Sequence, residues 1–461
     1  MTLSNSNQET TRPAFPWRKR GLVSYGIPFP QLVATHVERL GKLRVYALVS
    51  GSLARNTDTL SRLKEALGPK LVGERIGFPS HVPWNDLLRL AQEIKESGAE
   101  LVMTVGGGSI TDAVKLAGLI LANDLHDFKA LDAMSSRLKA AMQHDIDYKH
   151  ASDPQDVNPP PFVMINVPTT LSAGEYSPYA GGIDPTEGIK KIFILQSLAS
   201  DIVILDPELA RHSPEWVWMS SGVRSIDHCV ELLGSLSKID PETEEAAEKG
   251  LVLVARGLLK LRNDPSDLQA RLETQLGSNF AMDGKFTHHP RDFYEPSLIS
   301  WYLGLCRGVH LGGSHAIGHQ LGTMNVAHGY TSCILCPSVM KYNAKVNAAR
   351  QQWAIHILWS DSYIRQALSK RGLTAENDLG DLLDGFFREY GMPRTLKEVG
   401  VEGEANLQTL AVRSLKDPCC RTDPIPLTTP EQVMNILNTV ERLSHSEHKS
   451  SSSVCGPGNK N

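Results

Sequence analysis

One short segment constrains the fold of this chain more than any other. Residues 101–115 read LVMTVGGGSITDAVK, an apolar strand that runs into three glycines and a serine and then into a helix. Glycine lets the backbone approach an anion closely, and the free N–H groups at a helix start face that anion. The run from Gly106 to Ser109 is neither the six-residue dinucleotide fingerprint nor the P-loop. The segment therefore predicts a binding position for a pyrophosphate.

The rest of the chain shows two different patterns. Up to about residue 207, short apolar strands alternate with amphipathic helices, which predicts a mostly parallel sheet. Beyond that point helical periodicity dominates, for example over 215–262, 293–308 and 331–348. The expected parts are a flexible arm (1–20), an α/β nucleotide-binding domain with a Rossmann-like parallel sheet (21–207), an all-helical catalytic domain (208–445) and a disordered tail (446–461).

Composition excludes several classes of partner. The net charge is -4 without a basic block, so nucleic acid is not expected. No apolar run approaches the roughly 18 residues that span a membrane, and the polar start of the chain lacks the apolar core of a secretory signal. The 7 cysteines, an odd number scattered along the chain, fit a reducing compartment. We therefore expect a cytoplasmic protein whose partner is a small molecule.

Histidines in the second half lie at helical spacing. His315 and His319 are four residues apart, and His328 follows nine residues later. Arg224 and His228 are also four apart, so each pair shares one helix face. A lone histidine in a helix is more often a satisfied core residue. Several at this spacing, after a nucleotide-type domain, indicate an active site.

These motifs, in this order, resemble the iron-containing (group III) alcohol dehydrogenases and, within them, the maleylacetate reductase branch. The resemblance covers about residues 24 to 443. The glycine turn matches the family's GGGSxxDxAK except for Val114 at the alanine position. The matching segments are Gly106–Lys115, Pro168–Glu175, Ser221–Glu231, Gly313–Gly322 and His328–Asn343.

The resemblance implies a nicotinamide cofactor. It also leads us to expect a homodimer, because dimers are common in the proteins that this chain resembles. It assigns cofactor contacts to Gly107, Gly108 and Ser109 at the pyrophosphate, Asp112 at the nicotinamide end, Thr169 and Thr170 along the adenine and ribose side, and Lys190 at the nicotinamide ribose. Family members often hold the adenosine ribose with an acidic residue after the first strand. Val49–Ser52 offers no carboxylate there, so NAD and NADP both stay open.

The expected metal site departs from the family's pattern of one aspartate and three histidines. His228, His315 and His328 occupy the histidine positions, but Arg224 stands at the aspartate position. A guanidinium has no lone pair to offer and carries a positive charge. Asp227 is not expected to replace the ligand, because it is turned about 100° from its neighbour His228 on a helix. Fe²⁺ or Zn²⁺ on three histidines stays possible, and a metal-free site, as in the maleylacetate reductase branch, is the favoured prediction.

The sequence thus predicts an NAD(P)-dependent oxidoreductase that transfers hydride between nicotinamide and a small carbonyl compound, alcohol or oxo-acid. Arg224 would polarise the carbonyl or bind a substrate carboxylate, with His228 beside it and His319 as proton donor. Arg224 could instead form a structural salt bridge with Glu231 or with another carboxylate across the cleft. The alternatives are a metal-dependent alcohol dehydrogenase using three histidines, a lyase similar to dehydroquinate synthase, and a nucleotide-binding protein without catalysis.

Overall fold

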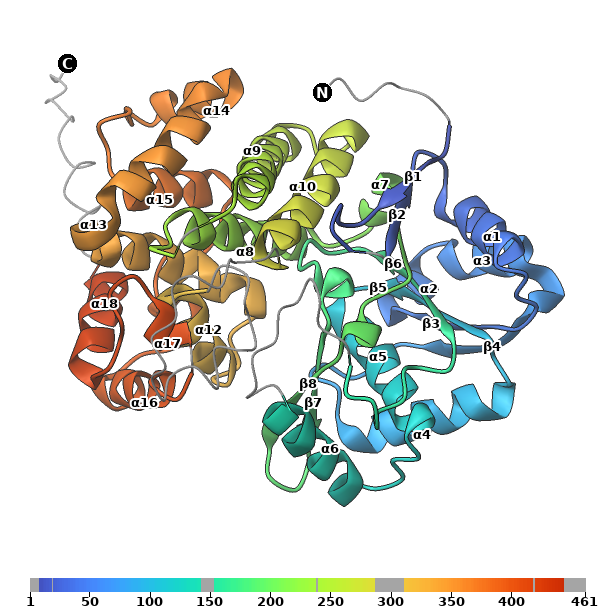
Figure 1. Cartoon of the computed structure of the whole chain (residues 1–461). Helices are drawn as coiled ribbons and strands as arrows, with labels where there is room; N and C mark the ends of the chain where they lie inside the picture. The colour runs from blue at the N-terminus through green and yellow to red at the C-terminus, as the bar shows by residue number, and fades with distance from the viewer. Residues whose placement is uncertain are drawn as a thin grey trace, which may run out of the picture.

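The computed structural model describes residues 8–18, 20–141, 153–237, 239–286, 311–417 and 419–442. Figure 1 shows two regions side by side, one built around a sheet and one made of helices. The helix expected over 293–308 and the tail expected over 446–461 lie outside the described residues.

Within the described part of the chain, a seven-stranded sheet forms the centre of the N-terminal region. Its order is β1-β2-β9-β6-β5-β3-β4, parallel throughout except for the antiparallel pair β1 and β2. A separate antiparallel pair, β7 and β8, lies outside this sheet. The strands are β1 (Thr10–Pro13), β2 (Leu22–Tyr25), β3 (Val45–Val49), β4 (Leu71–Ile76), β5 (Leu101–Gly106), β6 (Val163–Pro168), β7 (Tyr179–Asp184), β8 (Ile189–Ile194) and β9 (Ile202–Leu205).

Helices cover both faces of the sheet, as β3 illustrates. Successive side chains of a strand point to opposite faces. Ala47 belongs to the apolar cluster that includes α1 and α3, whereas Leu48 belongs to the cluster that includes α4 and α5. The apolar runs of β3 and β5 are buried along their whole length, as expected for parallel strands between two helical layers. The helices of this region are α1 (Phe29–Arg39), α2 (Gly51–Asn56), α3 (Thr59–Leu67), α4 (Trp84–Ser97), α5 (Gly108–Ala122) and α6 (Phe128–Ala141).

The N-terminal segment differs from the expected flexible arm. Residues 10–13 form β1, and the next two residues, Ala14 and Phe15, are buried in an apolar cluster that also includes residues of α10. The Trp17 indole N–H donates to Asp283 Oδ1 over 2.8 Å, which ties this segment to the helical region. The prediction of a flexible arm rested on the polar composition of residues 1–20. It did not take into account the short apolar stretch within this segment.

The C-terminal region is helical throughout its described residues from 207 to 442, which confirms the predicted α/β-then-α fold. Its central element, α8, is buried continuously from Trp218 to Leu233. In Figure 1, α8 lies between the sheet region and the outer helices. None of the described helices is long and apolar enough to cross a membrane. The helices are α7 (Pro207–Ala210), α8 (Glu215–Leu233), α9 (Pro241–Asn263), α10 (Leu268–Phe286), α12 (Gly313–Gly322), α13 (His328–Ser360), α14 (Ser362–Lys370), α15 (Leu379–Glu389), α16 (Glu404–Ser414), α17 (Cys419–Thr422) and α18 (Pro430–Arg442).

Candidate active site at the junction of the two regions

The glycine turn after β5 leaves an open position at the start of α5. Gly106 has φ +151°, and a Cβ there would lie 2.7 Å from Ile110 Cδ1 and 2.9 Å from Ser50 Cβ, so this position requires glycine. The cap of α5, Gly107, makes no side-chain cap bond. A Cβ on Gly108 would meet no described atom within 4 Å. The first N–H groups of α5 and the empty space beside Gly108 therefore fit an anionic group such as a pyrophosphate.

The threonine turn after β6 lies directly beside this glycine turn. The Thr169 N–H donates to Gly106 O over 3.0 Å, since β5 and β6 are neighbours in the sheet. Thr170 Cγ2 lies 3.2 Å from the position of a Cβ on Gly107. The structure thus brings together two groups of residues, Gly107–Ser109 and Thr169–Thr170, that the sequence assigned to one cofactor.

Asp112 and Lys190 lie together one turn further along α5. Asp112 Oδ2 accepts from the Gly181 N–H of β7 over 3.3 Å. Lys190 lies on β8, where its Nζ is 3.1 Å from the position of a Cβ on Gly181. Burial raises the pKa of Asp112, and the charges of Lys190 and Lys115 oppose that shift. The β7–β8 pair therefore places a cation beside a carboxylate at the edge of the predicted cofactor position.

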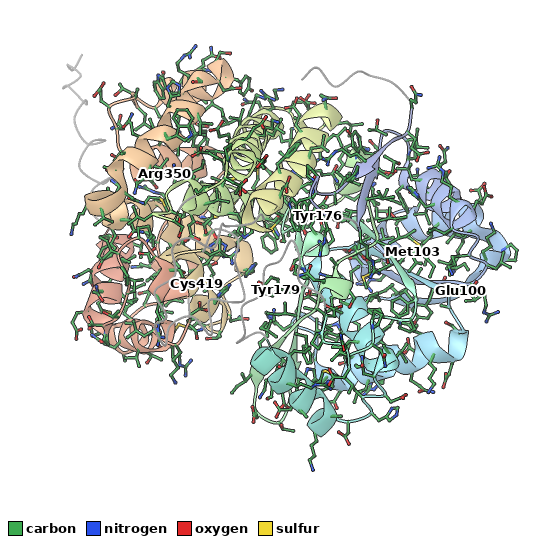
Figure 2. The ribbon with its side chains drawn as sticks, viewed as in Figure 1. Glu100, Met103, Tyr176, Tyr179, Arg350 and Cys419 are labelled. Carbon is green, nitrogen blue, oxygen red and sulfur yellow. The ribbon has the colours of Figure 1, made fainter. Side chains whose placement is uncertain are left out.

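Lys115 has a role that the sequence argument did not assign, although it belongs to the glycine motif. Its Nζ is buried and donates to three carbonyl oxygens: Gly174 and Ser177, both at 2.7 Å, and Tyr179 at 3.0 Å. Burial lowers its pKa to about 8. These bonds hold the loop that follows the threonine turn, and Figure 2 shows Tyr176 and Tyr179 of this loop near the boundary between the two regions.

The same threonine turn connects the sheet region to α8. The Leu171 N–H donates to Ser221 Oγ over 3.0 Å, and Ser225 Oγ donates back to Leu171 O over 2.7 Å. Ser221 and Ser225 flank Arg224 on α8. The threonine turn is thus hydrogen-bonded to the part of α8 that carries Arg224, although the two are about fifty residues apart in the chain.

Arg224 is only 3% exposed and lies among hydroxyl and imidazole groups. Its Nη1 donates to Ser332 Oγ over 3.1 Å, and its Nη2 lies 3.4 Å from His319 Nε2. Burial lowers the pKa of Arg224, and the nearby charges of Asp227 and Glu231 oppose that shift. Among the described residues, its hydrogen bonds reach side chains of α12 and α13 and no carboxylate, so the salt bridge considered with Glu231 is not formed.

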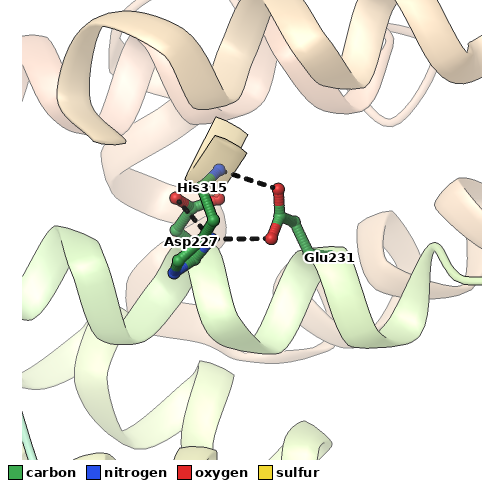
Figure 3. A group of neighbouring side chains, drawn as sticks. All are labelled: Asp227, Glu231 and His315. Carbon is green, nitrogen blue, oxygen red and sulfur yellow. Dashed lines mark hydrogen bonds and ion pairs between the residues drawn. The ribbon is translucent and has the colours of Figure 1, made fainter. Parts of the chain in front are cut away.

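Three buried side chains, Asp227, Glu231 and His315, form the group drawn in Figure 3. His315 Nδ1 lies 2.7 Å from Glu231 Oε2 and 3.5 Å from Asp227 Oδ2. Glu231 also accepts the N–H groups of Gly312 and Ser314 at the start of α12, where a carboxylate complements the helix dipole. Burial raises the pKa of both Asp227 and Glu231.

Asp227 has hydrogen-bond partners that the geometry of α8 alone did not indicate. On α8 alone it points away from His228, as expected, but α12 and α13 cross that side of the helix. Asp227 Oδ2 accepts hydroxyl hydrogens from Ser314, at 2.8 Å, and from Ser332, at 2.6 Å. Ser332 therefore bridges Asp227 and Arg224. The carboxyl group of Asp227 thus lies close to the buried guanidinium of Arg224, the residue that the resemblance aligns with the family's aspartate.

Two of the three predicted metal-binding histidines lie together in the structure. The rings of His228 and His315 stack, with centroids 4.8 Å apart and planes 20° apart. His328 is the first residue of α13. Within the described residues, the group whose ligand atoms all lie within 4.8 Å of one another consists of Asp227, Glu231 and His315, and not of the three histidines.

Comparisons with known proteins agree with this architecture. The model of the iron-containing alcohol dehydrogenase family matches residues 31–207, and the model of the C-terminal part of Fe-containing alcohol dehydrogenases matches residues 303–440. Dehydrogenase FUM7 of Gibberella moniliformis is 34% identical over 425 residues, which cover 88% of this chain and 92% of the relative.

Two solved structures show the same fold. Maleylacetate reductase from Agrobacterium tumefaciens aligns with a TM-score of 0.66 at 20% identity, over 92% of this chain and 95% of that one. Sulfoacetaldehyde reductase from Bifidobacterium kashiwanohense, solved with NAD⁺, aligns with a TM-score of 0.71 at 18% identity, over 93% and 99%. This chain is an oxidoreductase that belongs to the iron-containing alcohol dehydrogenase family.

Proposed function

We propose that this protein is a metal-independent reductase that transfers hydride between NADP(H) and a small oxo-acid or related carbonyl compound, similar to maleylacetate reductase. The observation that carries the proposal is the buried Arg224 at the family's aspartate position, with His319 Nε2 only 3.4 Å from its Nη2. A cation and an imidazole that meet at one point can bind and protonate the same oxygen.

Iron, which the family name implies, does not fit the side chains present. Both oxygens of Glu231 accept backbone N–H groups of α12, and Asp227 Oδ2 accepts two serine hydroxyls. A cation bound to these oxygens would compete with their hydrogen bonds and would lie close to the guanidinium of Arg224. Stabilisation of negative charge on the substrate therefore falls to Arg224 itself.

The residues have the following roles in the proposed reaction. Gly107, Gly108 and Ser109 hold the pyrophosphate at the start of α5, with Thr169 and Thr170 beside it and Asp112 and Lys190 at the nicotinamide end. The bound nicotinamide supplies or accepts the hydride. Arg224 donates hydrogen bonds to the carbonyl oxygen or to a substrate carboxylate, and His319 gives that oxygen its proton. His228, stacked on His315, lines the same position.

The end of β3 supports NADP rather than NAD. An acidic residue there would repel a 2′-phosphate, and this chain has Ser50 and Ser52 instead. The guanidinium of Arg55 lies 3.0 Å from the position of a Cβ on Gly51. Within the described residues Arg55 takes part in no hydrogen bond or ion pair, so its charge is available to a phosphate.

Titration of the two reduced cofactors tests this choice. Arg55→Ala should weaken NADPH binding about tenfold, as expected for loss of a charge-assisted bond, and change NADH binding less than twofold. Arg89→Ala is the matched control, because Arg89 is 71% exposed on α4 of the same region. Equal affinities for NADPH in the two variants would exclude Arg55 from cofactor recognition.

Steady-state assays test the function as a whole. We expect NADPH oxidation with members of a panel of aldehydes and oxo-acids, fastest with substrates that carry a carboxylate, and unchanged rates in the presence of a chelator. Stoichiometric iron or zinc that is lost together with activity would support the metal-dependent alcohol dehydrogenase instead. A homodimer and a cytoplasmic location stay predictions from the sequence.

A further inference from the structure

We propose that Asp417 is a positioning residue that sets the protonation pattern of His319 at the site of Arg224, an inference that rests on the proposed function. Asp417 lies shortly after α16, and its Oδ2 is 2.9 Å from His319 Nδ1, 98 residues away in the chain. None of the motifs matched in the sequence includes this carboxylate.

The carboxylate of Asp417 is held in a defined orientation. Its Oδ1 accepts the Cys419 N–H over 3.0 Å, so Oδ2 is the oxygen that faces His319. Figure 2 shows Cys419 in the helical region. The Asp417 side chain is 12% exposed, whereas that of His319 is 40% exposed. An ionised carboxylate can only accept, so Nδ1 of His319 must carry a hydrogen.

Arg224 imposes the matching requirement on the other ring nitrogen. Its Nη2 lies 3.4 Å from His319 Nε2, and a guanidinium can only donate. In the neutral ring, the hydrogen is therefore on Nδ1 and the lone pair on Nε2. Two neighbours on opposite sides of the imidazole specify the same tautomer.

This tautomer is the one that proton transfer at Nε2 requires. When His319 acts as the proton donor during reduction, the Nε2–H bond breaks, its electron pair stays on Nε2, and a new O–H bond forms on the substrate. The neutral ring that remains has the tautomer described above. A carboxylate at Nδ1 also favours the imidazolium from which this proton is donated, as the carboxylate of a catalytic triad does. The exposed part of His319 lets solvent restore the proton.

Two substitutions separate tautomer control from a structural role. In Asp417→Asn, the side-chain oxygen stays with the Cys419 N–H, and the amide NH₂ faces Nδ1. That donor favours hydrogen on Nε2, which then opposes the donor of Arg224. In Asp417→Ala, water can fill the space and either tautomer can form. We expect kcat with NADPH and the best panel substrate to fall about 10²–10³-fold in the Asn variant and about tenfold in the Ala variant.

The thermal midpoint should follow the opposite order, with the isosteric Asn variant at least as stable as the Ala variant. Asp124→Asn is the matched control, because Asp124 and His126 form an exposed pair 3.9 Å apart far from the site, and it should leave kcat unchanged. An Asn variant that is milder than the Ala variant in kcat would overturn the proposal, because a structural contact predicts that order.

A measurement without turnover distinguishes this proposal from the proposed function. In protein labelled with ¹⁵N-histidine, the His319 signals, assigned with His319→Gln, should show hydrogen on Nδ1 in the wild type and on Nε2 in Asp417→Asn. The same tautomer in both would overturn the proposal. The expected change in a protein that reduces no carbonyl substrate would confirm the positioning by Asp417 and contradict the proposed function.

Discussion

The two regions of this molecule build their parts of the candidate site in different ways. The sheet region offers mainly backbone: the glycine turn and the threonine turn lie at the ends of neighbouring strands, and each is a short, continuous piece of sequence. The helical region offers side chains, and these come from α8, α12, α13 and the segment after α16. The geometry of the backbone part is set by a few consecutive residues. The geometry of the side-chain part depends on packing between helices that are distant in the sequence.

This difference has a consequence for substitutions. A change at Gly108 of the glycine turn should affect cofactor binding and little else, because a Cβ there would meet no described atom within 4 Å. A change in the helical region should affect a network, because Ser332 alone contacts both Arg224 and Asp227. The predictions below test this contrast, beginning with the largest expected effect.

Arg224→Ala should lower kcat/KM by about 10²–10³-fold, which corresponds to roughly 2–4 kcal/mol of transition-state stabilisation. Lysine should restore only part of the activity, because a point charge does not reproduce the two-donor geometry of a guanidinium. NADPH affinity, measured by fluorescence titration, should stay within twofold of the wild type. Wild-type turnover in the Ala variant would make Arg224 a structural residue and remove the contrast between the regions.

Gly108→Val should weaken NADPH binding at least about tenfold while the thermal midpoint stays close to that of the wild type. The added side chain meets no described atom within 4 Å of its Cβ, so it enters the space proposed for the pyrophosphate and not the protein core. Gly108→Ala should have a smaller effect in the same direction. Unchanged cofactor titration in a folded Val variant would contradict the assignment of this turn.

Glu175→Gln should produce the smallest effect, a change in how stability depends on pH. Burial raises the pKa of Glu175 to about 7 from a usual 4.5, and the charge of Lys115 opposes this shift. The folded state therefore binds this proton more tightly than the unfolded state, and stability falls as the pH rises from about 4.5 to about 7. The glutamine variant lacks this loss, so its thermal midpoint relative to the wild type should be higher at pH 8 than at pH 5. A difference that does not vary between these pH values would show that the carboxyl group is ionised normally.

Most of the fold was predictable because its signals are local. The alternation of apolar strands and amphipathic helices up to residue 207, and the helical periodicity after it, correspond to the observed sheet and helices. The main difference is the segment 10–18, whose few apolar residues are buried because α10, more than 250 residues later, and residues of the sheet region lie beside them. Composition cannot reveal a contact of that range.

The sequence by itself determined the residue types: a glycine turn between a strand and a helix, histidines at helical spacing, and an arginine four residues before His228. Tertiary structure alone decided which of these residues meet. Asp227 became a partner of Arg224 through Ser332, and Asp417 became a partner of His319, because α13 packs against α8 and the segment after α16 lies against α12. Helical periodicity specifies which face of one helix a residue occupies. It does not specify what the neighbouring helix places opposite that face, because that depends on how the whole core packs.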